Sequence, residues 1–562
     1  MSERILIGVA WPYASGPRHI GHAAGAYLPS DVFARYHRMA GNEVLMVSGS
    51  DEHGTPITIE ADRRGVSPEE VIALYHPMIK ESFERLGISF DLYTETHTEN
   101  HAAVTQDMFL RLLENGYLFR DTTTQPYDPE YKRFLPDRYV EGTCPNCGYP
   151  DARGDQCDNC GHTLDPIDLL NPRSKLSGAT PEFRETEHFF LDLPKLTPQL
   201  LGYLEQGKEH WRPNVLNFSL NLVRQGLPAR AITRDIEWGV PVPLPGYEDK
   251  RIYVWFDAVI GYLSASKEWA QRQGEPDAWE KWWKLNPDGS APSRAYYFVG
   301  KDNIPFHAII WPAMLLGYGG LTLPYDVPAN EYLTMEDRKI STSRQFAVWL
   351  GDILDRYDAD AVRYFMTINA PETRDTNFTW SEFYRRTNDE LVATYGNLVH
   401  RVLTFTTRNY EGKVPQPGAL GERDERMLAD VRAVFDAVGE LVSQVRLKDA
   451  LREVMRLAQA ANVYLDEAEP WKRIKQDREA AGTSLWVVLQ VLAALRVLTQ
   501  PFMPFSAQRL HQYLGGEGDA STLPWEYREL PGGAPLGQPQ PLFRKLDEEG
   551  LAREMQALAV GD

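Results

Sequence analysis

The segment that most constrains the fold is a turn between a short apolar run and a helical pattern near the start of the chain. The run "ILIGVAW" precedes "YASGPRHIGHAAG", in which His19 and His22 flank Gly21. A helix that begins at such a turn presents unpaired N–H groups and about half a positive charge to a phosphate. We interpret the turn as the phosphate-binding edge of a nucleotide fold. Two histidines taken alone are more often ordinary surface or capping residues.

The first third of the chain alternates strand-like and helix-like segments. Residues 42–51 predict a second strand, and residues 67–87 predict a helix with Ser67 as its cap, Pro68 in its first turn and Gly87 as its stop. This alternation predicts an α/β fold with a Rossmann-like, doubly wound parallel sheet. Ligands of such sheets bind at the carboxyl ends of the strands.

The alternation stops near residue 118 and returns near residue 246. Strand-like runs resume in "RIYVWFDAVIGY", residues 251–262, and in "RAYYFVGKD". The sheet is therefore predicted to be split by an inserted domain. From about Ser381 the apolar residues step by three and four, as on one face of an amphipathic helix, and predict an all-α bundle. The stepping positions are Leu428, Val431, Phe435, Val438, Val442 and Val445.

All four cysteines lie in the predicted insertion, as two CxxC pairs with nine residues between them. Cys144 and Cys147 form the first pair, and Cys157 and Cys160 form the second. Four thiolates at this spacing match the ligand set of a tetrahedral Zn²⁺ ion. Two disulfides or a redox pair are the alternative, which a cytosolic chain disfavours. Since four cysteine ligands leave no coordination position open, we predict one structural zinc ion.

Composition and charge exclude several classes of protein. A formal net charge of −20 argues against a protein coated in nucleic acid, although local basic patches can still grip RNA. No signal-peptide pattern opens the chain. The longest apolar run, 485–498, is interrupted by Gln490 and Arg496 and is shorter than the ~20 residues of a membrane span. We expect a cytoplasmic protein with no membrane partner.

A second motif lies far downstream of the first, and the two motifs resemble a pair that occurs together in a known family. "HIGH", residues 19–22, and "KISTSR", residues 339–344, together resemble the paired signatures of class I aminoacyl-tRNA synthetases, of which the second is usually written KMSKS. The resemblance implies attack of an amino-acid carboxylate on the α-phosphate of ATP, with pyrophosphate leaving. Because the carboxylate is already ionised, catalysis would rest on positioning and on neutralising phosphoryl charge.

The resemblance implies that His19, His22 and Lys339 are catalytic and that Mg²⁺ accompanies ATP. One position differs, because Thr342 stands where the family has its second lysine. Part of the charge must then come from Lys339 and Arg344. The implied ATP-binding residues are His19, Gly21, His22, Gly300, Asp302, Lys339, Ser341, Thr342, Ser343 and Arg344.

Blocks along nearly the whole chain, among them "GSDEHGTPI", "SGATPEFRETEHFF" and "FVGKDNIPFHAIIWPA", resemble the methionine-specific branch of this family. Asp51 would pair with the substrate ammonium, and a thioether suits aromatic walls through sulfur–ring contacts. Trp11 and Val259 stand where many bacterial relatives have Leu and Pro, and Trp11 can narrow the pocket or stack on a neighbour. The implied methionine-binding residues are Trp11, Tyr13, Asp51, Trp255, Ala258, Tyr262, Phe306 and His307.

In the helical region, "YGNLVHR" and "EPW" resemble the family's anticodon readers. Asn397 and Arg401, four apart, share one helix face, and Trp471 would stack on an unpaired base. A core tryptophan among solvated charges is the alternative for Trp471. The partner implied is tRNA(Met), initiator and elongator. Nearby basic side chains would form a patch: Arg385, Arg386, Arg446, Arg452, Lys472, Arg473 and Lys475.

The resemblance also gives each predicted part a role. We expect residues 1–117 and 246–330 to be the two halves of the Rossmann catalytic domain, 118–245 an inserted connective domain with a zinc knuckle, 331–385 the KMSKS-type loop and linking region, 386–540 the anticodon-binding helix bundle, and 541–562 a C-terminal helix. The chain ends soon after the bundle, and we expect a monomer.

Several alternatives remain. The isoleucine, valine and leucine enzymes carry a larger editing insertion than residues 118–245 allow, and the cysteine enzyme uses its zinc to bind a substrate thiol. A small-molecule nucleotidyltransferase of the same superfamily has no use for an anticodon bundle. A non-catalytic RNA-binding scaffold is disfavoured by the intact His19, His22, Asp51 and Lys339.

Overall fold

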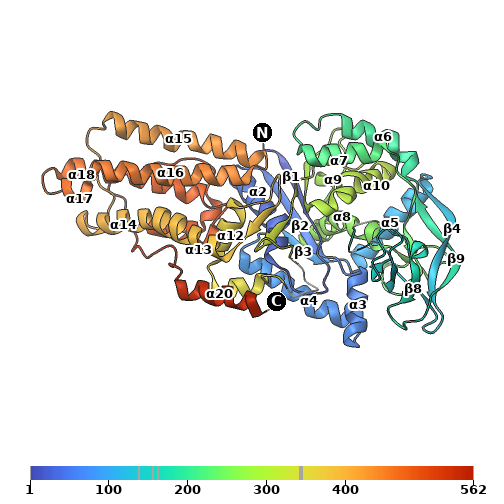
Figure 1. The fold of residues 1–562 in the computed structure, drawn as a ribbon. Helices are drawn as coiled ribbons and strands as arrows, with labels where there is room; N and C mark the ends of the chain where they lie inside the picture. Colours follow the sequence, from blue (N-terminus) through green and yellow to red (C-terminus); the bar gives the residue numbers. More distant parts are fainter. Residues whose placement is uncertain are drawn as a thin grey trace.

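A parallel β-sheet lies at the centre of the molecule, between a helical bundle at one end and the inserted domain at the other (Figure 1). The computed structural model describes residues 2–136, 139–154, 157, 159–160, 164–340 and 346–560. The central strands run in the order β14-β13-β1-β2-β3, with β15 beside β13, and pair in parallel. Their bounds are β1 Arg4–Val9, β2 Glu43–Ser50, β3 Leu92–Glu95, β13 Arg294–Gly300, β14 Pro324–Asp326 and β15 Ala329–Asn330.

Both faces of the sheet are buried, as parallel strands require. Ile5 and Ile7 of β1 point into one core and Leu6 into the other, following the two-residue period of a strand. The first core also holds residues of α2 and α4, and the second holds residues of α5, α8 and α10. These helices are α2 Leu28–Met39, α4 Pro68–Leu86, α5 Glu99–Glu114, α8 Val254–Arg272 and α10 Trp311–Tyr318.

The predicted doubly wound parallel sheet is thus confirmed, as is the long helix after residue 67. Ser67 and Glu70 form a reciprocal capping box at the start of α4, and Gly87 ends it with a left-handed φ of 82°. The first helix is less regular than expected. It passes from α1 (Ile20–His22) through a π-helical segment (Ala23–Tyr27) into α2, and such π segments are frequent at functional sites.

One strand prediction is wrong. Residues 251–262 contain only the two-residue strand β12 (Arg251–Ile252), after which α8 begins at Val254. The first turns of α8 are buried on nearly all sides. An apolar, aromatic-rich run of this kind carries no periodicity that separates a buried helix from a buried strand.

The inserted domain is built on the long antiparallel pair of β4 and β9, at the right of Figure 1. A second, three-stranded sheet in the order β7-β6-β8 carries the cysteine segment. Two helices, α6 and α7, return the chain to the central sheet. The bounds are β4 Leu118–Asp128, β5 Arg133–Phe134, β6 Val140–Thr143, β7 Ala152–Arg153, β8 Leu170–Ser174, β9 Glu182–Leu191, α6 Leu193–Glu205, α7 Pro213–Arg224, β10 Arg230–Ala231 and β11 Thr233–Arg234.

The predicted helix bundle forms the other end of the molecule (Figure 1). The amphipathic helix α15 ends at Ser443, so Val445 lies outside it, in a left-handed turn with a φ of 54°. By length and composition α18 could cross a membrane, but it is fully buried within the bundle. The bounds are α13 Trp380–Arg386, α14 Asn397–Asn409, α15 Glu422–Ser443, α16 Leu447–Ala468, α17 Pro470–Arg473, α18 Arg478–Leu498, α19 Pro504–Tyr513 and α20 Glu548–Val560.

Shorter elements connect the sheet to the bundle and complete its edges. They are α3 Thr55–Arg64, α9 Glu280–Trp283, β16 Leu333–Met335, α11 Leu350–Arg356, α12 Ala359–Ile368 and β17 Thr376–Phe378.

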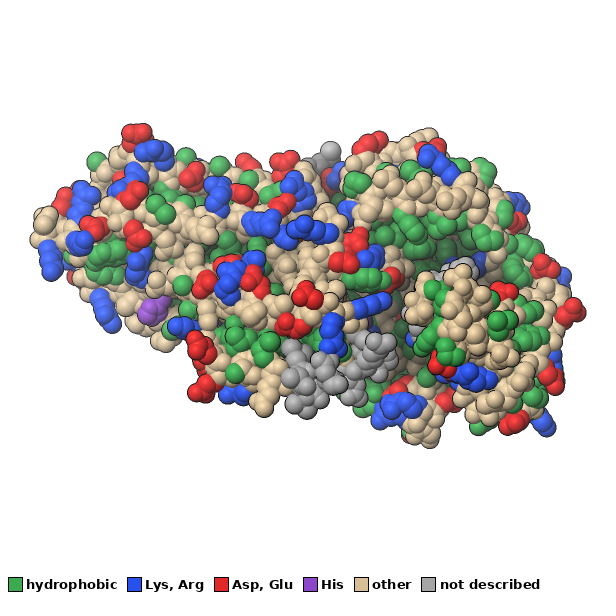
Figure 2. All heavy atoms as spheres, in the orientation of Figure 1, with side chains coloured by type: hydrophobic (Ala, Val, Ile, Leu, Met, Phe, Trp, Pro, Cys, Tyr) green, Lys and Arg blue, Asp and Glu red, His purple; other side chains and the backbone are tan. Residues whose placement is uncertain are grey.

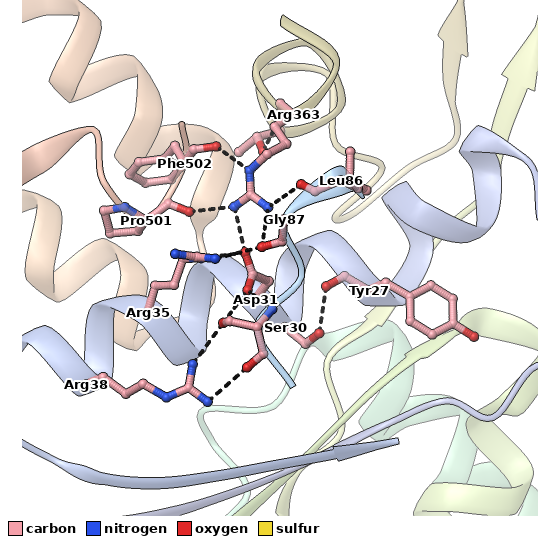
Figure 3. Close-up of polar contacts among 12 residues, drawn as sticks. Tyr27, Ser30, Asp31, Arg35, Arg38, Leu86, Gly87, Arg363, Pro501 and Phe502 are labelled. Carbon is pink, nitrogen blue, oxygen red and sulfur yellow. Dashed lines mark hydrogen bonds and ion pairs between the residues drawn. The ribbon is translucent and has the colours of Figure 1, made fainter. Parts of the chain in front are cut away.

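A buried ion pair joins the sheet domain to the bundle (Figure 3). Arg363 of α12 is fully buried, and its Nη2 lies 2.7 Å from Oδ2 of Asp31 on α2. The same guanidinium donates to the carbonyl oxygens of Phe502 and Pro501, between α18 and α19, and of Leu86 at the end of α4. Since α2 continues the helix that starts at the histidine signature, this junction ties that helix to the bundle.

Candidate active site

A cavity of about 450 Å³ opens beside the carboxyl ends of β1, β2 and β13. It is lined by every residue predicted to bind ATP or methionine that the structure describes. Two larger hollows, of about 1110 and 850 Å³, contain none of them. Four predicted ATP-binding residues, Ser341, Thr342, Ser343 and Arg344, lie outside the described residues. The predicted residues that line the cavity are Trp11, Tyr13, His19, Gly21, His22, Asp51, Trp255, Ala258, Tyr262, Gly300, Asp302, Phe306, His307 and Lys339.

The two signature histidines stack on each other, with ring centroids 3.7 Å apart. The backbone N–H of His19 donates to Nδ1 of His22 at 3.3 Å, which leaves Nε2 of His22 to carry the proton. Burial, and then the charge of Arg18, lower the pKa of His19 to about 3, and burial likewise lowers the pKa of His22. Both rings are therefore neutral hydrogen-bond donors at physiological pH. A Cβ at Gly21 would lie 3.0 Å from the His19 ring, so a side chain there would crowd the stack.

Asp51 follows β2 and is held by its backbone. Its N–H donates to the carbonyl of Pro12, and its carbonyl accepts from Ala14. The carboxylate is 4% exposed and accepts one long bond, 3.3 Å, from the N–H of His53. It has no ion pair within the described part of the chain. Burial, and then the nearby charge of Asp257, raise the pKa of Asp51 well above its ordinary value. A buried carboxylate without a cation suits a ligand that brings one.

The aromatic wall of the cavity already uses its own polar atoms. His307 donates from Nδ1 to the carbonyl of Asn303 at 2.9 Å, so its Nε2 accepts the hydroxyl of Tyr262 at 2.6 Å. Burial lowers the pKa of His307 to about 4, which keeps it neutral. The indole N–H of Trp255 donates to the carbonyl of Ala231. The ring surfaces are left for an apolar side chain.

Trp11 fits because two glycines make room for it. A Cβ on Gly49 would lie 2.3 Å from the indole, and one on Gly261 would lie 2.7 Å from it. The indole meets the Tyr262 ring edge to face at 6.3 Å. Its Nε1 is buried without a hydrogen-bond partner in the described chain. Trp11 therefore fills space between β2 and α8 and presents one side to the cavity, as does Val259.

Among the cavity residues that sequence reasoning missed, Arg18 and Tyr332 carry polar groups that face the predicted site. Arg18 is buried, donates from Nη2 to the carbonyl of Gly16, and leaves Nε without a partner among the described residues. Its place next to the histidine signature is the one signal that pointed to it. Tyr332 contacts two predicted residues, since its hydroxyl donates to Asp302 and the ammonium of Lys339 lies 5.2 Å from its ring. No sequence pattern marked it.

The four cysteines lie together and carry no disulfide. The Sγ atoms of Cys144 and Cys160 are 3.9 Å apart, and those of Cys147 and Cys157 are 3.6 Å apart. All four Sγ atoms lie within 4.8 Å of one another. A tetrahedron with Zn–S bonds of about 2.3 Å has edges of about 3.8 Å, so the cluster fits this ion. The four thiols could hold one metal ion and leave no coordination position open.

The predicted anticodon residues lie on neighbouring helices. The guanidinium of Arg401 on α14 lies 4.6 Å from the ring of Trp471 on α17, and Asn397 is exposed one turn earlier on α14. Trp471 is half-buried. Acidic and basic side chains are mixed over the visible face of the bundle (Figure 2). Much of the predicted basic patch is neutralised, because five of its members pair with carboxylates: Arg385, Arg386, Arg446, Arg452 and Lys472.

Two family models together cover nearly the whole chain. Residues 5–403 match the model described as tRNA synthetases class I (M). Residues 414–559 match the model described as the anticodon binding domain of methionyl tRNA ligase. The first match ends inside α14, and the second begins in the segment between α14 and α15.

Curated relatives and solved structures agree with these models. The methionine–tRNA ligase of Roseiflexus castenholzii is 57% identical and that of Thermomicrobium roseum 53% identical, each over 99% of both chains. A methionyl-tRNA synthetase of Mycobacterium tuberculosis in complex with methionyl-adenylate superposes with a TM-score of 0.79 at 25% identity, covering 97% of this chain and all of that one. The chain belongs to the methionine–tRNA ligase family of class I tRNA synthetases.

Proposed function

We propose that this chain activates L-methionine with ATP and transfers the methionyl group to the 3′-terminal adenosine of tRNA(Met). One observation carries the proposal. A single cavity joins an unpaired buried carboxylate, Asp51, to a pair of neutral histidines at a helix start, His19 and His22. The first suits the ammonium of an amino acid, and the second suits the phosphates of a nucleotide.

In the activation step the methionine carboxylate attacks the α-phosphate and pyrophosphate leaves. His19 and His22 donate hydrogen bonds to phosphoryl oxygens. Lys339 and Arg344 neutralise the charge that develops on the leaving group, and the hydroxyls of Ser341, Thr342 and Ser343 donate hydrogen bonds to it. Mg²⁺ bound with ATP would share that charge. Gly300 and Asp302 bind the ribose, and Tyr332 holds Asp302 in place.

Asp51 fixes the ammonium of methionine, and the aromatic wall takes its side chain. The thioether lies beside Trp255, Tyr262 and His307, whose polar atoms are already bonded, so a side chain that needs hydrogen bonds would not find them there. The small side chain of Ala258 lines the cavity and leaves space beside the aromatic rings for the methionine side chain. The selecting residues are Trp11, Tyr13, Trp255, Ala258, Tyr262, Phe306 and His307.

In the transfer step a ribose hydroxyl of the terminal adenosine attacks the adenylate carbonyl. Asn397, Arg401 and Trp471 read the anticodon, with a base stacking on the indole that Arg401 already contacts. Initiator and elongator tRNA(Met) share that anticodon, and both are substrates. The enzyme acts in the cytoplasm.

Exchange of isotope between pyrophosphate and ATP, run with each amino acid in turn, tests the proposal. Methionine should be the only strong stimulator, and leucine, isoleucine, valine and cysteine should give background rates. Strong exchange with another amino acid would refute the methionine assignment. Exchange that needs no amino acid would favour a small-molecule nucleotidyltransferase.

A Cys₄ zinc would fix the fold of the inserted domain and take no part in the chemistry, because no coordination position stays open. Elemental analysis should find at least one zinc per chain, and Cys157→Ser should contain one zinc fewer than the wild type. Equal zinc content in the two proteins would contradict the ligand set of Cys144, Cys147, Cys157 and Cys160.

A further inference from the structure

A second cluster of metal-ligating side chains lies immediately beside the cavity. Glu52 follows Asp51 in the chain but does not line the cavity. Its Oε1 lies 3.7 Å from Nδ1 of His76 on α4, and the same nitrogen lies 3.8 Å from Oε2 of Glu95 at the end of β3. One donor atom from each of the three lies within 4.8 Å of the others. Three elements that are separate in sequence thus aim ligand atoms at one point.

The cluster contains buried polar atoms that the protein leaves unbonded. Glu52 is fully buried, and its Oε1 accepts from the hydroxyl of Ser50, while its Oε2 has no hydrogen-bond partner in the described chain. The same hydroxyl is hydrogen-bonded to Nδ1 of His76 at 2.5 Å, and a metal ion at this nitrogen would replace that bond. The hydroxyl of Tyr93 is also buried and unpartnered there, and its ring lies 5.6 Å from that of His76. Buried polar atoms are normally bonded, because each unmet one costs about 1–3 kcal/mol.

The charges of the cluster favour a cation. Two carboxylates, Glu52 and Glu95, face one imidazole, that of His76. Carboxylate and imidazole are both ligands of divalent first-row metals. A divalent ion would remove the repulsion between the two carboxylates.

We propose that Glu52, His76 and Glu95 bind one divalent first-row metal ion, with water at the remaining positions. Two carboxylates and one imidazole suit Mn²⁺ or Zn²⁺ better than Mg²⁺, which prefers oxygen ligands alone. Because His76 and Glu95 are partly exposed, the ion can enter from solvent. The site ties β2, α4 and β3 together directly behind Asp51 and shares no ligand with the cysteine cluster.

Titration of Mn²⁺ followed by electron paramagnetic resonance tests the site. The protein is the full chain, supplied with one equivalent of zinc for the cysteines and free of ATP, so that neither the cysteines nor a nucleotide takes up Mn²⁺. We expect one bound Mn²⁺ per chain and a thermal midpoint that rises with Mn²⁺ concentration. His76→Ala and Glu95→Gln should each weaken binding at least about tenfold. Glu84→Gln, exposed on the same helix α4, should change nothing.

Three results would overturn the proposal. The first is a wild-type chain that binds neither Mn²⁺ nor a second Zn²⁺ at millimolar concentrations. The second is unchanged Mn²⁺ binding in Glu95→Gln. Because the Glu95 side chain is partly exposed, this substitution should leave the fold intact, and Mn²⁺ binding by the variant therefore reports on the site itself. The third is loss of Mn²⁺ binding in Cys157→Ser, which would assign the ion to the cysteines instead.

Discussion

Two buried carboxylates on the same face of the catalytic fold are treated in opposite ways. Asp31 accepts four bonds, from Arg35, Arg363 and both the N–H and the hydroxyl of Ser89. Burial alone would raise its pKa, but these partners lower it to about 2. Asp51 is as deeply buried and has one long bond to a backbone N–H, and its pKa is raised.

The difference separates a structural charge from a functional one. The Asp31 junction is complete within the protein and joins α2 to the bundle (Figure 3). The cavity around Asp51 is incomplete within the described chain, where Nε1 of Trp11, Nε of Arg18 and Nδ1 of His19 also lack partners. A ligand in the cavity could supply partners for these three groups.

The largest expected effect comes from breaking the complete junction. Asp31→Asn should lower the free energy of unfolding by about 3–5 kcal/mol, because it leaves Arg363 buried without its counter-charge. Urea unfolding measures this loss. Replacing both partners, as Asp31→Leu with Arg363→Met, should recover most of it. A single variant as stable as the wild type would contradict the structural role of the pair.

The matching change in the cavity should cost activity and spare stability. Asp51→Asn should lower kcat/KM for methionine in pyrophosphate exchange by about 10²–10³, the loss of one buried charge contact. The pKa of Asp51 is higher in the folded state than its ordinary value of 3.8, so the folded state binds the Asp51 proton more tightly than the unfolded state does. The contribution of Asp51 to the free energy of unfolding therefore falls as pH rises above 3.8. The variant should therefore be at least as stable as the wild type at pH 8 in urea unfolding. A loss of stability like that of Asp31→Asn would remove the contrast.

A smaller effect is expected at the far end of the bundle. Trp471→Ala should lower kcat/KM for tRNA in aminoacylation by about tenfold, the value of one lost base stack, and leave pyrophosphate exchange intact. Arg426→Ala, at an exposed residue of α15 paired with Glu422 and outside the predicted basic patch, is the control and should have little effect on either reaction. If exchange falls together with charging in Trp471→Ala, the tryptophan supports the fold and does not read the anticodon.

For the two signature histidines we expect no effect of pH on the kcat of pyrophosphate exchange near neutral pH. Since the pKa of His19 is lowered to about 3, and that of His22 is also lowered, neither ring gains charge above about pH 5. The kcat of exchange at saturating substrates should stay level between about pH 5.5 and 7.5. A fall in kcat towards low pH with a midpoint near 6.5 would show that a histidine of ordinary pKa takes part.

Local sequence patterns predicted the bounds of a helix correctly where the residues that start and end it lie within the helix or next to it. Ser67, Pro68 and Gly87 bounded α4 correctly because caps and stops act within a turn of the helix. The run 251–262 misled because burial on all sides removes the periodicity on which such predictions depend. Arg363 and Asp31 gave no signal, since they lie 332 residues apart and meet only through packing.

For the candidate site, motifs named the residues and tertiary structure supplied their surroundings. The two signatures and the family resemblance brought out residues that line one cavity, from Trp11 to Lys339. Nothing in the sequence indicated that Gly49 and Gly261 hold the Trp11 indole between them, or that Nε of Arg18 is buried without a hydrogen-bond partner among the described residues. These features depend on contacts between distant segments.

Proton release on methionine binding tests the central claim, that Asp51 is left unpaired for the substrate ammonium. Calorimetry at several pH values, in two buffers of different ionisation enthalpy, counts the protons released. Burial raises the pKa of Asp51, and the substrate ammonium should lower it again. The wild type and Asp31→Asn should therefore release protons over the pH range in which Asp51 of the free protein titrates, and Asp51→Asn should release fewer. Methionine binding to the wild type without proton release, or equal release in Asp51→Asn, would contradict the claim.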